Sequence, residues 1–417
     1  MKIPGNYRDG ARGGTRTFRV PVLSGLFLAL IIVVGCATKP APLPHIDEPE
    51  RSHLVLVDED RWPDFTDDMG GDSLRTAIDR SLIYYNRLPE DRIFRMGDAT
   101  YSLEEMKDSL LLLRNMLESD PTPTELRHRL RETFDLYQSL GQGGDGSVLF
   151  TGYYEPILRG SREKTDVYRY PIYRTPDDHR VIHLGRFHSK YEGERIIARI
   201  EEGTVLPYFT RGEIDIEGRL EGRELEIVWT DDPVDLFFMH IQGSGTIVLD
   251  GGEVIQVSYD QANGRAYRSL GRHLARQGVL TLAAVSLQGI RDYLRSSNDM
   301  MTLMAHNESY IFFRVVDDGP RGALDVTITA GRTIATDPAL FPRGGLALVT
   351  LKKPVINRAG RIDAWVPFSR LVLNQDAGGA IKGPGRVDLF FGTGDEAGLM
   401  AGYMKEYGTL YFLVKKR

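Results

Sequence analysis

The sequence predicts a mainly β fold with an N-terminal helical part. Residues 72–140 carry apolar side chains at helical spacing, whereas from Val148 onward short β-rich runs alternate with glycine turns. Many short strands separated by such turns favour β-barrels over a doubly wound sheet. The chain has 417 residues, of which 41% are hydrophobic, and this is enough for two or three domains with real cores.

Two helix-start signals lie in the helical part. Ser102 and Glu105 form a capping box, and Thr122 with Glu125 repeats it with Pro123 at the first helical position. We interpret the apolar stripes that follow as packing faces. For the second helix the stripe consists of Leu126, Leu130, Phe134 and Tyr137. A glycine-rich run at 141–146 marks the end of this part.

The strand-rich part contains several short elements and one helical interlude at about 264–296. A hairpin turn is expected at Asp250-Gly251-Gly252. The segment from Gln242 to Gly245 is rich in glycine and lies between two expected strands. It is therefore either a tight turn or a place where the backbone approaches a ligand, and a poor candidate for a phosphate loop. The expected strands are 236–242, 246–249, 254–259, 310–316, 326–329, 346–351, 388–391 and 410–414.

The N-terminus has the pattern of a secretory signal peptide. Residues 1–19 are basic, and the uncharged stretch at 20–35 is 16 residues long, shorter than the roughly 20 needed to span a bilayer. An uncleaved anchor is the alternative. Val33-Val34-Gly35-Cys36 resembles a bacterial lipoprotein signal, which implies that Cys36 is lipidated and that Ala37 directs sorting to the outer membrane. We expect a signal peptide at 1–35 and a proline-rich tether at 36–70.

Composition and missing motifs exclude several classes of protein. Cys36 is the only cysteine, so a disulfide framework and cysteine catalysis are excluded. A formal net charge of −6 gives no reason to expect nucleic-acid binding. The sequence contains no Gly-x-Ser-x-Gly, His-Glu-x-x-His or phosphate-loop motif. We therefore expect no cofactor and no metal.

Three aspartates near the C-terminus are candidate catalytic residues. Asp388 opens an apolar strand, where partial burial would raise its pKa and make a neutral acid available. Asp376 lies in the glycine-rich loop before that strand, and Asp337 lies upstream. The alternative for Asp376 and Asp337 is a role as turn or cap residues.

Five parts of the sequence together resemble those of a known protein family. They are the stretches at 150–156, 206–215, 240–245 and 307–314 and the region that contains Asp337, Asp376 and Asp388. Across nearly the whole length after Cys36 the chain resembles the membrane-bound lytic murein transglycosylase A family. The resemblance implies a double-psi β-barrel main domain with a second, smaller inserted β-barrel domain, and a groove between them for a glycan strand. The expected parts are a helical part of the main domain at 71–150, the inserted barrel at 151–250 and the rest of the main domain at 251–417.

The same resemblance implies roles for individual aspartates. Asp388 would be the single acid/base, and Asp376 and Asp337 would line the site, holding Asp388 protonated or stabilising positive charge. The implied reaction cleaves the β-1,4 bond between N-acetylmuramic acid and N-acetylglucosamine, with the muramic acid C6 hydroxyl as the attacking group and a 1,6-anhydro ring in the product. It needs no enzyme nucleophile, in agreement with the missing motifs.

Glycan contacts are implied at two further segments. Gln242, Gly243 and Ser244 match the family's groove motif, and Thr151 and Tyr154 are candidates of the same kind, with core packing as the alternative for Tyr154. The expected partners are peptidoglycan glycan strands and, through Cys36, lipid on the periplasmic side of the outer membrane. Residues 259–265 depart from the family's usual Ala-Gly-x-Asn-Gly-His. An inverting hydrolase, a non-catalytic peptidoglycan-binding lipoprotein and a metal site made of the three aspartates stay open as alternatives.

Overall fold

A computed structural model describes residues 53–281 and 286–417, and every structural statement below concerns those two ranges. The expected signal peptide, Cys36 and the tether up to residue 52 lie outside them. Within the expected tether, β1 (Leu54–Leu56) already pairs with a strand of the main sheet, and Asp67 pairs with Ser369. The folded part therefore begins before residue 70.

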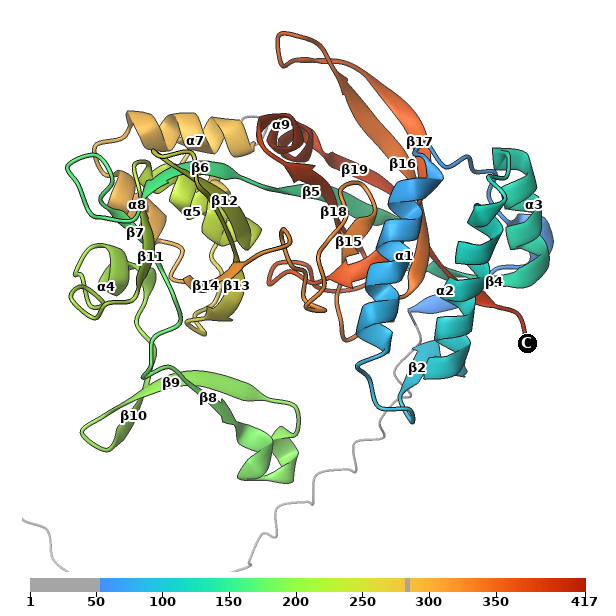
Figure 1. Cartoon of the computed structure of the whole chain (residues 1–417), viewed down its shortest axis with the longest axis horizontal. Helices are drawn as coiled ribbons and strands as arrows, with labels where there is room; N and C mark the ends of the chain where they lie inside the picture. The colour runs from blue at the N-terminus through green and yellow to red at the C-terminus, as the bar shows by residue number, and fades with distance from the viewer. Residues whose placement is uncertain (1–52, 282–285) are drawn as a thin grey trace, which may run out of the picture. The chain divides into compact units, whose positions relative to one another are not determined.

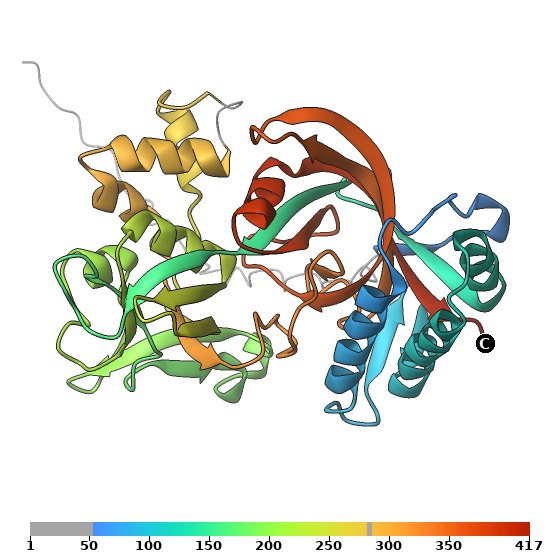
Figure 2. The same ribbon diagram turned by 45° about the horizontal axis from the view of Figure 1, so that its top comes forward.

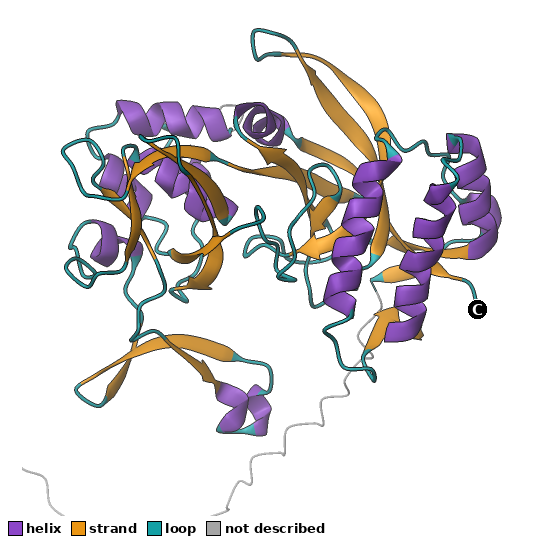
Figure 3. Cartoon of the chain, viewed as in Figure 1, coloured by secondary structure: helices purple, strands orange, loops and turns teal. Residues whose placement is uncertain are grey.

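Six strands form a closed barrel (Figure 1). Around the barrel the order is β5, β18, β15, β17, β16 and β19, and β19 closes the ring by pairing antiparallel with β5. The fold is thus mainly β with a barrel at its centre, as the sequence predicts (Figure 3). The barrel strands are β5 (Val148–Glu155), β15 (Thr333–Ala335), β16 (Leu346–Ile356), β17 (Ile362–Asp376), β18 (Arg386–Thr393) and β19 (Lys405–Lys415).

An N-terminal helical layer packs on this barrel. The capping boxes at Ser102 and Thr122 are both present. The second helix ends at Thr133, however, so Phe134 and Tyr137 belong to a strand, β4, that pairs with β19 and β1. The prediction of a helical stripe through these two residues was wrong, because this ladder overrides the local helical spacing. The elements are the 3-10 helix η1 (Glu59–Arg61), α1 (Gly71–Tyr85), β2 (Ile93–Met96), β3 (Ala99–Ser102), α2 (Leu103–Glu118), α3 (Pro123–Thr133) and β4 (Phe134–Ser139).

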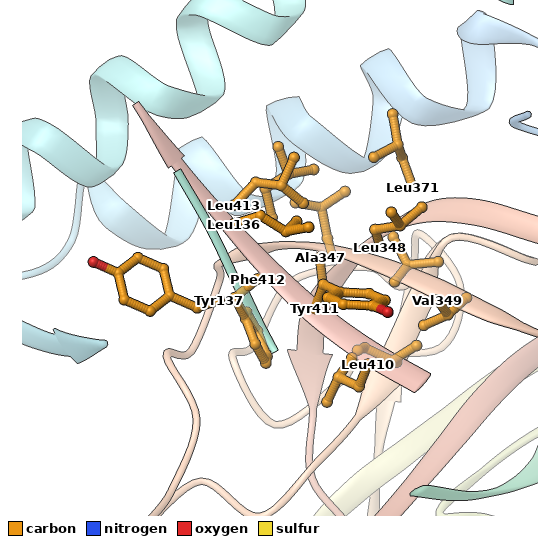
Figure 4. Close-up of a cluster of buried hydrophobic side chains, with 14 of the residues drawn as sticks. Leu136, Tyr137, Ala347, Leu348, Val349, Leu371, Leu410, Tyr411, Phe412 and Leu413 are labelled. Carbon is orange, nitrogen blue, oxygen red and sulfur yellow. The ribbon is translucent and has the colours of Figure 1, made fainter. Parts of the chain in front are cut away.

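The main core lies between these helices and the barrel strands (Figure 4). Leu136 of β4, Leu348 of β16 and Leu413 of β19 are fully buried in it. Burying such a side chain stabilises the fold by roughly 1.5–3 kcal/mol. Arg332, just before β15, is also fully buried and donates to both carboxylate oxygens of Asp67, at 2.6 and 2.8 Å.

A second sheet of six strands holds the middle of the chain, in the order β14-β13-β12-β6-β11-β7 (Figure 2). A bridge between Arg174, next to β7, and Phe313 of β14 links its two edge strands. Its core includes Ile172, Val228 and Ile247. The strands are β6 (Ile157–Ser161), β7 (Tyr170–Tyr173), β11 (Glu226–Thr230), β12 (Ser244–Leu249), β13 (Val254–Ala262) and β14 (Ile311–Val316). A separate three-stranded sheet consists of β8 (Arg180–His183), β9 (Arg195–Glu201) and β10 (Thr204–Pro207).

The expected domain boundary at residue 250 falls in the turn between β12 and β13, which pair with each other. The same sheet continues to Val316. Because a sheet is not divided between two domains, we propose that the inserted domain ends near Val316.

Helices connect and cover the second sheet. The expected strand at 236–242 was wrong, since these residues lie in a helix, α5 (Pro233–Gln242). The Asp232 carboxylate accepts from two N–H groups at its start, Pro233 occupies the first turn, and Gly243, at φ 89°, ends it. The helices of this part are α4 (Arg211–Asp215), α5, α6 (Leu270–Arg276), α7 (Leu287–Ser296) and α8 (Met300–Ala305), with the 3-10 helices η2 (Leu184–Arg186) and η3 (Ser189–Tyr191). Another helix, α9 (Asp395–Tyr403), packs on the barrel strands β5 and β18 instead.

Two further expectations are settled by these elements. The helical interlude at 264–296 contains α6 and α7, whereas the expected strand at 326–329 is only an isolated bridge between Arg321 and Thr327. None of the helices in the two described ranges has the length and apolar character needed to cross a bilayer.

Candidate active site

Four neighbouring strands place two of the three aspartates in one row. Asp376 of β17 is opposite Ala335 of β15, Ala335 is opposite Asp388 of β18, and Asp388 is opposite Thr151 of β5. Residues paired across strands project to the same face of a sheet. Val387 and Leu389, on either side of Asp388, are buried in the barrel core, so the Asp388 side chain lies on the opposite face.

Asp388 is a partly buried carboxyl that, within the described ranges, accepts a hydrogen bond from one side chain. The Thr151 hydroxyl donates to its Oδ1, and Arg386 Nη2 donates in turn to Thr151 Oγ1 at 3.2 Å. Burial raises the pKa of Asp388 to about 6, against the lowering effects of the Thr151 hydrogen bond and the Arg386 charge. The charge of Asp376 raises this pKa as well. Asp388 therefore keeps its proton up to about pH 6, well above the range of an ordinary aspartate, which is a property suited to a general acid.

Asp376 has three donors instead of one. The Tyr153 hydroxyl donates to its Oδ2 at 2.8 Å, and the N–H groups of Ala323 and Ala377 donate to its Oδ1, each at 2.8 Å. Burial raises the pKa of Asp376 above its ordinary value, and these three hydrogen bonds limit the rise. The Tyr153 ring packs against Phe390 of β18 with 5.2 Å between ring centroids, which fixes its position.

Asp337 holds a loop. Its Oδ1 accepts from the N–H of Ala339 at 3.2 Å, and its Oδ2 accepts from the N–H of Gly383 at 2.9 Å. The Lys382 ammonium lies 3.8 Å from Oδ1. Asp337 thus fastens the connection between β17 and β18, which carry Asp376 and Asp388. Its Asx turn to Ala339 is the geometry expected of a turn residue.

The glycine-rich segment lies beside β5. Gln242 ends α5, and its side-chain Oε1 accepts from the N–H of Tyr154 at 3.1 Å. Gly243, in the left-handed region, turns the chain from α5 into β12, where Ser244 is buried. The segment therefore connects a helix to a strand, and Gln242 joins the second sheet to the barrel strand that carries Thr151.

Tyr154 faces away from the aspartates. Its side chain is 3% exposed and packs against Ala397 and Ala401 of α9. Its hydroxyl accepts a hydrogen bond from Arg291 Nη2 at 2.9 Å. This environment fits the packing alternative.

Sequence reasoning missed Tyr153 and Arg386. The signal for Tyr153 was present, since alternation along a strand puts it on the same face as Thr151, two residues earlier. Arg386 likewise lies two residues before Asp388. Their contacts with Asp376 and Thr151 depend on strand pairing across more than 200 residues of sequence.

Two cavities lie away from the aspartates. One of about 260 Å³ is lined by Tyr170, Trp229 and Arg211, and one of about 440 Å³ lies beside β13 and β14. Neither is lined by Asp388 or Asp376. Among the residues described, no three His, Cys, Asp or Glu side chains are arranged to hold a metal ion.

Comparisons with known proteins identify the family of the chain. A family model of the MltA specific insert domain matches residues 149–314, and a model of the 3D domain matches residues 332–414. The membrane-bound lytic murein transglycosylase A of Escherichia coli K12 is 31% identical over 67% of this chain and 69% of its own length.

Solved structures of the same family resemble this chain along most of its length. A membrane-bound lytic murein transglycosylase from Agrobacterium tumefaciens is 29% identical, with a TM-score of 0.68 over 84% of this chain and 98% of that one. The E. coli MltA with bound chitohexaose is 25% identical, with a TM-score of 0.67 over 88% of this chain and 96% of that one. On this evidence the chain is an enzyme that belongs to the membrane-bound lytic murein transglycosylase A family.

Proposed function

We propose that the protein is a lytic transglycosylase of peptidoglycan. It cleaves the β-1,4 bond between N-acetylmuramic acid and N-acetylglucosamine and leaves 1,6-anhydro-N-acetylmuramic acid ends. The observation that carries this proposal is Asp388, a partly buried carboxyl on barrel strand β18 whose pKa is raised to about 6 and whose Oδ1 accepts a hydrogen bond from Thr151. The E. coli relative with bound chitohexaose supports a β-1,4-linked glycan as the substrate class.

In the proposed mechanism Asp388 acts first as an acid and then as a base. Its proton passes to the bridging oxygen as the bond between that oxygen and C1 breaks, and positive charge develops on the sugar ring. The C6 hydroxyl of the same muramic acid then attacks C1, and its proton passes to Asp388. The proton balance closes without water and without an enzyme nucleophile, because the attacking group is already held in the substrate.

The neighbouring residues have supporting roles in this proposal. Thr151 orients Asp388 through its hydroxyl, and Asp376 offers negative charge to the developing cation. Gln242 contacts the glycan, whereas Ser244 is buried. The Gln242 carbonyl is engaged by Tyr154, and its amide nitrogen has no partner within the described ranges, so this nitrogen is free to donate to a sugar hydroxyl. Asp337 acts indirectly, through the loop that it fastens.

We further propose that the enzyme works at the periplasmic face of the outer membrane, anchored by acyl chains on Cys36. Several acyl chains on one residue give stable attachment, whereas one chain gives only marginal binding. The name of the E. coli relative, membrane-bound, supports this location.

Mass spectrometry of muropeptides tests the function. Purified sacculi digested with the chain from residue 37 onward should release fragments with anhydro ends. Reducing ends would contradict the proposal and favour an inverting hydrolase, and no release would favour a binding protein. Asp388→Asn should abolish release and keep sacculus binding, whereas Asp166→Asn, at an exposed position, serves as the matched control.

A further inference from the structure

We propose that Tyr153 is a positioning residue that keeps Asp376 ionised, so that the proton shared by the two carboxyls resides on Asp388. This inference rests on the proposed function, because it explains which carboxyl is the acid. It concerns the tyrosine hydroxyl and not a contact with substrate.

One strand serves both carboxyls. Thr151 and Tyr153 project from the same face of β5, two residues apart. The Thr151 hydroxyl donates to Asp388, and the Tyr153 hydroxyl donates to Asp376. Because the Tyr153 ring packs against Phe390, its hydroxyl is held at Asp376 and does not reach Asp388 in its place.

The two carboxyls differ in their donors. Asp376 accepts three hydrogen bonds, and Asp388 accepts one from a side chain. Hydrogen bonds donated to a carboxylate favour its ionised form. Two carboxylates in one row repel each other, and the charge of Asp376 raises the pKa of Asp388, so the two groups compete for a proton. That proton goes to the carboxyl with fewer donors, which is Asp388.

Two cations lie near the aspartates, and neither is a partner of Asp376. The charge of Arg386 lowers the pKa of Asp388, and Arg386 donates a hydrogen bond to Thr151, which in turn donates to Asp388. The Lys382 ammonium lies beside Asp337. The partners of Asp376 are Tyr153 and two backbone N–H groups. Burial and the charge of Asp376 hold the pKa of Tyr153 well above its ordinary value, so its hydroxyl remains a donor over the whole working pH range.

The test is Tyr153→Phe, which keeps the ring against Phe390 and removes only the hydroxyl. Asp376 then binds a proton more readily and takes it from Asp388. We expect kcat to fall roughly tenfold and the alkaline limb of the pH profile to move to lower pH by about one unit, as expected for a lost hydrogen bond to a charged group, with little change in KM. An unchanged kcat and pH profile would overturn the inference.

Two controls separate this role from a structural one. Tyr208→Phe removes another tyrosine hydroxyl that donates to an aspartate, Asp178, at 2.8 Å, in the inserted domain, and should leave the profile unchanged. In an Asp376→Asn background, Tyr153→Phe should have no further effect on the pH profile, because the group through which it acts is gone. An equal shift in both backgrounds would contradict the inference.

A measurement on the unaltered protein completes the test. Carbon NMR titration of the aspartate carboxyls should show Asp388 retaining its proton to higher pH than Asp376, and the reverse order would overturn the inference. The proposed function is judged separately, by the anhydro ends that the wild type releases. Anhydro products with an unshifted Tyr153→Phe profile would reject the role of Tyr153 alone.

Discussion

At the scale of single residues, Asp388 is the acid of the proposed mechanism, and its raised pKa makes it costly to the fold. Burial raises its pKa from 3.8 to about 6, so the folded state binds the proton more strongly than the unfolded chain does. Stability therefore falls as the pH rises from about 4 to about 6 and is constant above that. Below pH 4 both states are protonated and the cost vanishes.

Asp388→Asn should consequently stabilise the protein at pH 8 and not at pH 4. A difference of about two pKa units corresponds to roughly 3 kcal/mol, as an upper estimate. Urea unfolding of the two proteins at both pH values measures it. An equal change in the free energy of unfolding at pH 4 and pH 8 would show that the effect does not come from ionisation.

Thr151 and Tyr153 should have opposite effects on the pH profile of kcat. The Thr151 hydrogen bond lowers the pKa of Asp388, so in Thr151→Val this pKa rises and the alkaline limb moves to higher pH. Turnover falls at the same time, because the carboxyl loses its orienting partner. Thr151→Ser, which retains the hydroxyl, should restore the wild-type profile, and a shift in the serine variant would assign the effect to the lost methyl group.

At the scale of elements, β5 shows how alternation divides two tasks. Thr151 and Tyr153 face the aspartates, while Gly152 and Tyr154 face α9. A Cβ at Gly152 would lie 2.7 Å from both the Cα of Ala401 and the ring of Phe391. The close approach of α9 to β5 therefore requires glycine at this position.

Gly152→Ala should destabilise the protein by about 1–3 kcal/mol through overpacking. Thermal or urea unfolding measures this loss. Gly251→Ala is the matched control, because a Cβ there meets no atom within 4 Å and Gly251 does not adopt a positive φ. Equal stabilities of the two variants would mean that α9 moves away from β5 at no cost.

Local signals predicted some elements and failed for others. The capping boxes at Ser102 and Thr122 predict both helix starts correctly, because the cap is a contact within four residues. The run at 236–242 is apolar except for His240 and Gln242, and such a short run has no period that separates a helix from a strand. The signals for this helix lie just outside the run. Its start is marked by Asp232 and Pro233, and its end is marked by Gly243.

At the scale of the whole molecule, the sequence predicts the mainly β fold and the family, while the site depends on distant pairings. Asp388 and Thr151 are 237 residues apart, and Asp376 and Tyr153 are 223 apart. Strand registers of this kind have no local signal. Asp388 was a candidate catalytic residue because it opens an apolar strand. The three hydrogen-bond donors of Asp376, in contrast, become visible only in the folded structure.

The buried pair of Arg332 and Asp67 joins the segment before α1 to the barrel across 265 residues. Arg332→Met leaves the Asp67 carboxylate without its bidentate partner and should cost about 3–5 kcal/mol. The double variant Arg332→Met, Asp67→Leu should recover much of that loss, as measured by urea unfolding. A double variant as unstable as the single one would show that packing, and not the unpaired charge, sets the cost.

The closure of the barrel by β19 against β5 also makes the proposed site depend on strands that are far apart in the chain. β19 lies more than 240 residues after β5, and such distant pairings form slowly. A chain shortened so that β19 is lost would still carry Thr151 and Asp388, but β5 would have no partner to close the ring.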